Sequence, residues 1–250
     1  MMRAGQRRVL AGLRQQIERL DGGFRHRPVV PFGVPALDLC LPGGGLALGA
    51  LHEVVESGPA AEFAGAATLF IAGIAARLEG PVLWCLNRRD LFAPGLARAG
   101  LHPDRVIFAE TQRDRDILSA MEEGLRERGL AAVIGEVTRL GLTASRRLQL
   151  AAEASGVPAF ALRRWWTVAE RDLTILPTVA FTRWRLAPQA SLALPSPGLG
   201  RARWQVDLVR CRGGEPRSWI LEACDAAGRL ALPSDPLPRL EAPLRRAAAR

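Results

Sequence analysis

The chain of 250 residues contains no lysine and no tyrosine, and each of its 34 basic residues is an arginine. Schiff-base catalysis on a lysine is therefore excluded, and so is a phosphate clamp built on the lysine of a P-loop. The formal net charge is +9, and this excess of arginine favours binding to polyanions or to acidic partners.

Long apolar runs are also missing. A membrane span needs about 20 consecutive apolar residues, and no stretch of the chain provides them. The first residues lack the apolar segment and cleavage site of an export signal. We therefore expect no membrane contact and a cytoplasmic location, with association with the nucleoid as an option.

Metal-binding patterns are absent from the sequence. The four cysteines form no C-x-x-C pair, and the three histidines, His26, His52 and His102, have no cysteine or aspartate at ligand spacing. We expect neither a disulfide framework nor a metal site, and no cofactor.

The composition, with 48% hydrophobic residues, supports one packed core. Residues 1–27 form an expected amphipathic helix and linker, with Leu10, Leu13 and Ile17 at helical spacing. This helix can dock on its own core or on another subunit, and the sequence leaves both options open. Residues 28–233 form the expected core domain, and the arginine- and proline-rich residues 234–250 form an expected mobile tail.

Residues 50–163 alternate short apolar runs with helical segments. Strands that are apolar throughout are typical of a parallel sheet buried between helices, which predicts an α/β fold. After residue 175 the pattern changes to the segments 179–188, 201–211 and 217–224. In the second of these, Trp204, Val206 and Leu208 alternate with polar residues, as in a strand with one wet face, so we expect an antiparallel C-terminal extension.

One glycine-rich segment precedes the first core strand, and another follows it. Gly43, Gly45 and Gly49 have a spacing that superficially resembles a dinucleotide-binding loop, but they precede the strand rather than follow it. We interpret them as a turn that leads into this strand.

The loop after the same strand stands where a P-loop belongs. Gly58 begins it, and Gly65 is expected to open the following helix. Ala66 and Ala67 replace the lysine and the hydroxyl residue of a P-loop, and Thr68 comes one place late for a magnesium ligand. We therefore interpret the segment as a degenerate nucleotide loop that is mainly structural.

Two segments of the chain resemble a known family. Residues 37–55, LDLCLPGGGLALGALHEVV, resemble the start of the RecA core, and residues 82–110, which begin with VLWCLNRRDLF, resemble ImuA proteins. ImuA proteins are RecA-like, SOS-induced and encoded with ImuB, a Y-family-like polymerase homologue, and with an error-prone replicative-type polymerase. The resemblance covers about residues 28–232. It implies a RecA-like core and a non-catalytic accessory role in damage-induced mutagenesis.

The resemblance also assigns positions to the nucleotide site. Asn87, Arg88 and Arg89 stand where RecA carries a catalytic glutamate, and Asp90 is the nearest carboxylate. Glu136 stands about where the family has its acidic Walker B residue. A lone glutamate at a strand end is more often a cap or rim charge, and without a lysine it would have little to activate.

Arg163, Arg164, Trp165 and Trp166 follow the fifth core strand, where RecA carries a DNA-contacting loop. Aromatic rings beside guanidinium groups suit single-stranded nucleic acid, a protein interface or plain packing, and the sequence leaves these three options open. His52 and Glu53 lie together on the first core strand, where a structural pairing is favoured over a catalytic dyad.

The resemblance implies partners: an ImuB-type polymerase homologue, further copies of the chain, and, as additional options, RecA and single-stranded DNA. Two rival functions remain. An ATP-dependent recombinase requires nucleotide hydrolysis, which the absence of lysine disfavours. A cell-division inhibitor of the SulA type is the second, and the basic C-terminal extension fits it less well.

Overall fold

The computed structural model describes residues 27–191 and 200–233. The expected N-terminal helix with Leu10, Leu13 and Ile17, and the expected tail 234–250, lie outside the described residues, so both stay predictions. None of the helices in the described ranges is long and apolar enough to cross a membrane.

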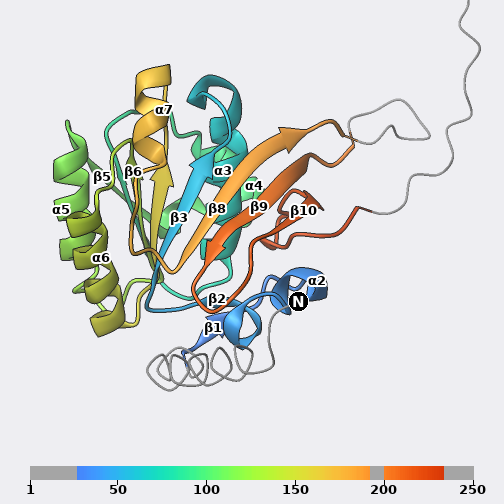
Figure 1. Cartoon of the computed structure of the whole chain (residues 1–250), viewed down its shortest axis with the longest axis horizontal. Helices are drawn as coiled ribbons and strands as arrows, with labels where there is room; N and C mark the ends of the chain where they lie inside the picture. Colours follow the sequence, from blue (N-terminus) through green and yellow to red (C-terminus); the bar gives the residue numbers. More distant parts are fainter. Residues whose placement is uncertain (1–26, 192–199, 234–250) are drawn as a thin grey trace, which may run out of the picture.

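An eight-stranded sheet organises the chain (Figure 1). Its order is β10-β9-β8-β3-β7-β6-β4-β5. The six strands from β8 to β5 are mutually parallel, and β9 runs antiparallel to both of its neighbours, β8 and β10. The strands are β3 (Leu51–Glu56), β4 (Val82–Leu86), β5 (Val106–Glu110), β6 (Ala132–Val137), β7 (Ala159–Arg163), β8 (Thr182–Gln189), β9 (Arg203–Cys211) and β10 (Arg217–Glu222). The α/β fold with a mostly parallel sheet and antiparallel C-terminal strands is confirmed.

Strand β8 joins the two parts of the sheet. It pairs in parallel with β3, where His52 lies opposite Thr182, and antiparallel with β9. The chain reaches β8 from β7 through a crossover that passes β3, as parallel strands of one sheet require, and turns back at β9. On β9, Trp204, Val206 and Leu208 are buried while the residues between them are partly exposed, which confirms the alternation.

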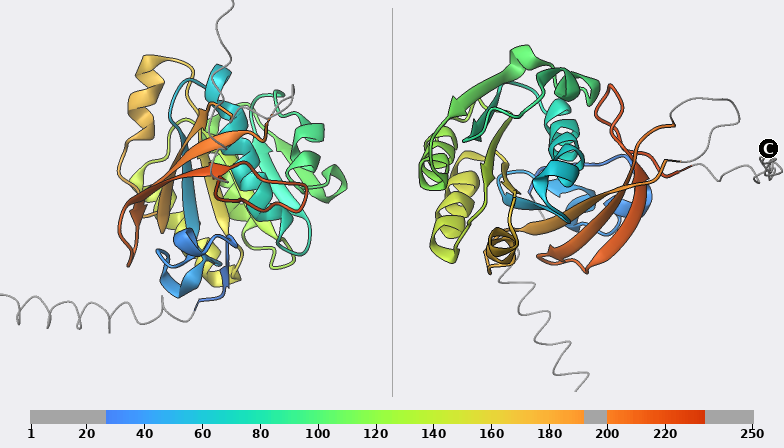
Figure 2. Two further views of the ribbon diagram at one scale, coloured as in Figure 1. Left: turned by 90° about the vertical axis from the view of Figure 1, so that its right-hand side faces the viewer. Right: turned by 90° about the horizontal axis from the view of Figure 1, so that it is seen from above.

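Helices cover both faces of the sheet (Figure 2). α3 (Ala60–Ala76) and α4 (Ala93–Arg98) pack on one face, and α5 (Asp114–Gly124) and α6 (Leu142–Ser155) pack on the other. The crossover from β7 to β8 contains α7 (Val168–Thr174), which we did not expect. Its sequence signal is a capping box, because Thr167 and Glu170 each bond the other's backbone amide.

The remaining elements are short. A two-stranded sheet joins β1 (Val29–Val30) to β2 (Leu46–Ala47), and the other elements are α2 (Pro35–Asp38) and the 3-10 turns η1 (Pro42–Gly44) and η2 (Pro103–Arg105). The glycine-rich run forms the turn that leads into β2 and β3, as expected. A Cβ atom on Gly45 would lie 2.7 Å from the carbonyl oxygen of Val30, so the close approach of β1 requires glycine there.

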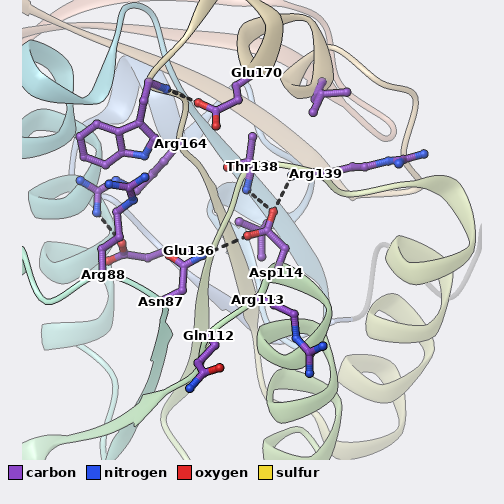
Figure 3. A pocket seen from close by; sticks show the side chains of 13 residues that line it. Asn87, Arg88, Gln112, Arg113, Asp114, Glu136, Thr138, Arg139, Arg164 and Glu170 are labelled. Atoms are coloured by element: carbon purple, nitrogen blue, oxygen red, sulfur yellow. Dashed lines mark hydrogen bonds and ion pairs between the residues drawn. The ribbon is translucent and has the colours of Figure 1, made fainter.

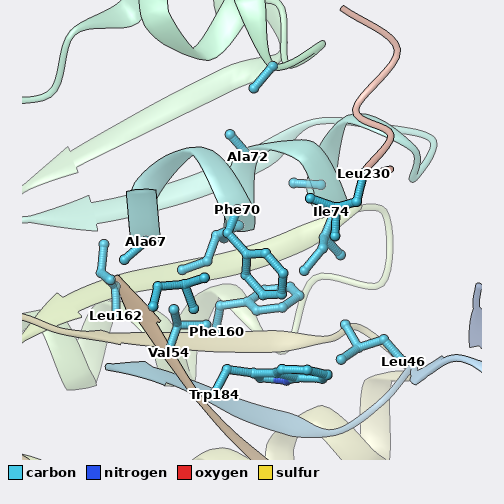
Figure 4. Packing of buried hydrophobic residues seen from close by; sticks show 14 of the residues in the cluster. Leu46, Val54, Ala67, Phe70, Ala72, Ile74, Phe160, Leu162, Trp184 and Leu230 are labelled. Atoms are coloured by element: carbon cyan, nitrogen blue, oxygen red, sulfur yellow. The ribbon is translucent and has the colours of Figure 1, made fainter. Parts of the chain in front are cut away.

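Trp184 lies at the centre of the core on the α3 face (Figure 4). Its ring centroid is 5.5 Å from that of Phe32 and 5.7 Å from that of Phe70, and its indole nitrogen donates to Thr182 Oγ1 at 2.8 Å. One side chain from β8 thus joins the segment before α2 to helix α3.

We expect Trp184→Ala to lower the free energy of unfolding by about 3–5 kcal/mol, because it empties a fully buried site. The matched change at the partly exposed Trp166 should cost less than about 1 kcal/mol. Urea denaturation of both variants measures the difference, and equal losses would contradict this account of the core.

Candidate functional site

The loop between β3 and α3 is too short for a phosphate-binding loop. It spans residues 57–59, and α3 already begins at Ala60 after the N-cap Pro59. The expectation that Gly65 opens this helix is therefore wrong, because the alanine-rich sequence continues the helix toward the strand. Ala66, Ala67 and Thr68 are buried inside the helix. They face the core and not a ligand.

The start of α3 is also closed. The ring of Phe63 covers Gly58 so tightly that a Cβ atom there would lie 2.1 Å from a ring carbon. The amide of Ala60, the first residue of the helix, donates to the carbonyl of Trp165 at 2.8 Å. A phosphate cradle needs exposed amides at this place.

Arg164 occupies the space that lies beside this closed loop. Its guanidinium group contacts Asp90 at 3.0 Å, Glu136 at 2.5 Å and Glu56 at 3.3 Å. These carboxylates come from the end of β3, the loop after β4 and strand β6, so one arginine joins four segments. Glu136 also accepts a hydrogen bond from the indole nitrogen of Trp84 at 2.8 Å.

The carboxylates of this Arg164 cluster are perturbed by burial. Desolvation raises the pKa of Glu56 to about 8, against the opposing effect of Arg164. Burial likewise raises the pKa of Glu136, although Arg164 again opposes it. Neither oxygen of Glu56 has a hydrogen-bond partner among the described residues. Glu136 is thus a buried member of an ion cluster and not the rim charge that a lone glutamate usually is.

A second buried cluster lies around Glu53 on β3. Glu53 accepts hydrogen bonds from Arg163 at 2.7 Å, Arg183 at 2.6 Å and Thr178 at 2.8 Å. His52 points to the other face, where it bonds Thr182 and the carbonyl of Ala47. The expected pairing of His52 with Glu53 is wrong, because successive strand residues face opposite sides of a sheet. Burial lowers the pKa of His52 to about 4.

A cavity of about 420 Å³ opens at the carboxyl ends of β4, β6 and β7, and we call it the crevice pocket (Figure 3). Its walls come from segments that follow four parallel strands and from the start of α7. It is lined by Asn87, Arg88, Gln112, Arg113, Asp114, Glu136, Val137, Thr138, Arg139, Arg164, Trp166, Glu170 and Leu173.

The four consecutive arginine and tryptophan residues 163–166 differ in their exposure to solvent. Arg163, Arg164 and Trp165 are buried, and only Trp166 is partly exposed, in the wall of the crevice pocket. A nucleic-acid or partner contact by this segment stays a prediction, and Trp166 is its accessible member. Sequence reasoning missed Asp114 and Arg139 in the pocket. Both residues follow predicted parallel strands, and this position could have indicated the pocket, because the carboxyl ends of parallel strands meet at one edge of the sheet.

Among the described residues, no group of three or more histidine, cysteine or acidic side chains is arranged to hold a metal ion. The four cysteines are free thiols. Burial raises the pKa of Cys85 and of Cys224 to about 12, and that of Cys211 to about 11, so these thiols are poor nucleophiles at neutral pH.

Comparison with known proteins decides the family. The chain is 41% identical over 207 residues to Protein ImuA of Caulobacter vibrioides, from strain NA1000 / CB15N and equally from strain ATCC 19089 / CIP 103742 / CB 15. The match covers 80% of this chain and 85% of each relative. The chain belongs to the ImuA family. This membership supports an accessory role in SOS mutagenesis. No protein-family model matches the chain.

We expect Arg164→Met to lower the free energy of unfolding of this ImuA protein by about 3–5 kcal/mol, since it leaves buried carboxylates without their counter-ion. The control Arg185→Met removes a half-exposed partner of Asp207 and should cost at most about 1 kcal/mol. Chemical denaturation compares the two. If both variants lose the same amount, the Arg164 cluster does not hold the strand ends together.

The pKa of Glu56 predicts how stability depends on pH. The folded chain retains a proton on Glu56 up to about pH 8, whereas the unfolded chain loses it above about pH 4.5. Stability that is present below pH 4.5 is therefore lost as the pH rises toward 8. Glu56→Gln mimics the protonated form and should reduce this loss by about 1–3 kcal/mol.

Urea denaturation at a series of pH values between these limits measures the loss for the wild type and for Glu56→Gln. The exposed Glu62 provides the control, because Glu62→Gln should leave the pH dependence of the wild type unchanged. A Glu56→Gln variant with the same pH dependence as the wild type would rule out a retained proton on Glu56.

Proposed function

We propose that this ImuA protein is a non-catalytic, RecA-like accessory factor of SOS-induced, error-prone translesion synthesis, which works by binding other molecules. The observation that supports this most directly is the closed nucleotide site. The loop after β3 is sealed by Phe63, and Arg164 fills the space among the carboxylates beside it.

Hydrolysis of a nucleotide by a P-loop fold needs a cradle of amides, a cation on the phosphates and a hydroxyl ligand for magnesium. The chain has no lysine to supply the cation. Thr68 is buried within α3, so its hydroxyl is not placed as a magnesium ligand. Both oxygens of Glu136 accept hydrogen bonds, from Trp84 and Arg164, which leaves this carboxylate poorly suited to activate water.

The proposed partners are an ImuB-type polymerase homologue, further copies of the chain, RecA and single-stranded DNA, in the cytoplasm or at the nucleoid. A binding role needs contact surfaces outside the core. The apolar face of Leu10, Leu13 and Ile17 and the tail 234–250 are the proposed contacts with the polymerase homologue. The basic composition adds electrostatic attraction to acidic partners.

Co-elution of the full chain with the ImuB-type polymerase homologue tests the proposal. We expect a complex for the wild type, and its loss when Leu10, Leu13 and Ile17 are replaced by polar residues or when residues 234–250 are removed, depending on which surface carries the contact. Circular dichroism serves as the folding control for each variant. A complex that survives both changes would move the contact to the folded core.

The same preparations distinguish the rival functions. The absence of any complex would contradict the adaptor role. DNA-stimulated ATP hydrolysis by the purified chain would instead establish a recombinase-like activity, and binding to the tubulin-like division protein would support the SulA-type alternative.

A further inference from the structure

The two edges of the eight-stranded sheet differ in their protection. β5 and β10 end the sheet on opposite sides of the molecule (Figure 1). At β10, the exposed residues Pro216 and Arg217 stand at the start of the strand. Near its end, the amide of Glu222 donates to the carbonyl of Ala231 at 2.8 Å, so a returning segment covers this part of the edge. Proline, charged side chains and covering segments keep an edge strand from pairing with further strands.

The edge at β5 lacks these protections in the described part of the chain. β5 pairs there with β4 alone, and its sequence VIFAE contains neither proline nor a basic residue. Its one charged residue, Glu110, lies at the end of the strand and is paired with Arg89. Ile107 is 52% exposed and Phe108 is 42% exposed, and as successive strand residues they lie on opposite faces of the sheet. An open edge with apolar side chains on both faces favours pairing with another strand.

The backbone groups of β5 alternate between β4 and the open edge. The amide of Thr111 donates to the carbonyl of Leu86 on β4 at 2.9 Å. Because this direction alternates along a strand, Ala109 also turns its backbone groups toward β4, whereas Phe108 and Glu110 turn theirs outward. Phe108, at the centre of β5, therefore offers both an amide and a carbonyl to a partner strand.

A second copy of β5 that runs antiparallel fits this edge. When the pairing is centred on Phe108, this residue lies opposite Phe108 of the other copy, and their outward backbone groups form a hydrogen-bonded pair. Ile107 then lies opposite the small Ala109, and Val106 lies opposite Glu110. Aromatic side chains that meet directly across two strands stabilise the pairing.

The charges next to β5 favour this register over its neighbours. With Phe108 at the centre, no like charges lie opposite each other between residues 104 and 112. A shift of the centre by one residue toward the C-terminus would bring Arg105 opposite Arg113. A shift by one residue toward the N-terminus would bring Asp104 opposite Glu110. Like charges that lie directly opposite are unfavourable, so the edge is self-complementary in one register.

We propose that two copies of the chain associate through antiparallel pairing of their β5 strands about Phe108, which joins the two sheets into one. The two-fold axis uses both open edges, so the assembly closes at two copies. A five-residue edge buries less than the roughly 800 Å² per partner of a standard interface, so we expect a reversible dimer with a Kd of about 1–100 μM. The biological role of this dimer rests on the proposed function, in which a second copy is one partner, but the association itself does not require that function.

Sedimentation velocity of the full chain over about 1–300 μM measures the association. Phe108→Lys places like charges opposite each other on the two-fold axis, and we expect it to weaken the dimer by about tenfold or more. Phe108→Glu should have the same effect. An equimolar mixture of the two variants should associate at least about fivefold more tightly than either alone, because opposite charges then meet across the axis.

Matched controls carry the same change outside the β5 edge. Leu150→Lys replaces an exposed side chain of α6, and Ile220→Lys replaces one of the other edge strand, β10. Both should dimerise within about twofold of the wild type. Circular dichroism serves as the folding control for each variant.

A cross-linking experiment tests the same register without a change of charge. Phe108→Cys should form an intermolecular disulfide under mild oxidation, because the Cα atoms of a hydrogen-bonded antiparallel pair lie about 5.5 Å apart. Leu150→Cys provides the control, which should not exceed the background from the native cysteines. Cross-linking of Phe108→Cys at that background level would contradict the pairing about Phe108.

Two further outcomes would overturn the proposal. In the first, the wild type stays monomeric up to about 300 μM. In the second, Phe108→Lys dimerises as tightly as the wild type, whereas polar replacement of Leu10, Leu13 and Ile17 abolishes the dimer, which would assign the association to the N-terminal segment.

Co-elution with the polymerase homologue separates this proposal from the accessory function. A wild type that dimerises but forms no complex with the homologue contradicts the accessory function and leaves the dimer established. A monomeric wild type whose complex with the homologue is lost in Phe108→Lys would show that β5 pairs with another protein, which overturns the proposal of a second copy.

Discussion

The ion cluster around Arg164 is the interaction on which the carboxyl edge of the parallel sheet depends. It joins the ends of β3 and β6, the loop after β4 and the residue after β7, and three of its four ionisable side chains are almost completely removed from water. Desolvation of such groups offsets much of their attraction, so the cluster contributes more to a defined arrangement than to net stability. The cluster thus holds the strand ends around the buried guanidinium group of Arg164. The neighbouring loop is then sealed by Phe63 and by the amide of Ala60.

Arginine side chains also hold loops in place elsewhere in the molecule. Arginine offers five donors in a planar group that stays charged, so one side chain can hold several loop carbonyls at once. Arg105 binds the carbonyls of Ala76, Leu78 and Gly80 after α3, and Arg210 binds those of Thr178 and Ala180 before β8. Many of the arginines that make the composition so basic are thus occupied within the fold. Fewer guanidinium donors are therefore free to bind partners than the count of arginines implies, although each arginine keeps its positive charge.

Two neighbouring places at the carboxyl edge of the sheet have opposite properties. The loop after β3 is short and covered by Phe63, and the carboxyl groups beside it surround the guanidinium group of Arg164. The crevice between β4 and β6 is open, and the carboxylates of Asp114 and Glu170 in its wall accept hydrogen bonds from backbone amides. The sheet thus combines a covered loop after β3 with an accessible crevice at the ends of β4 and β6.

The sequence by itself determined the α/β class, the antiparallel C-terminal end of the sheet and the lack of a lysine clamp. Apolar strands such as β4 and β6, the alternation of β9 and the missing residue type are local properties that can be read along the chain. Only the tertiary structure decided which charged residues are buried. From the sequence alone, Arg164 would be placed on the surface, because its partners Glu56, Asp90 and Glu136 lie far from it along the chain. The parallel sheet brings the ends of their strands together. The early start of α3 at Ala60 and the cover of Gly58 by Phe63 are likewise consequences of packing.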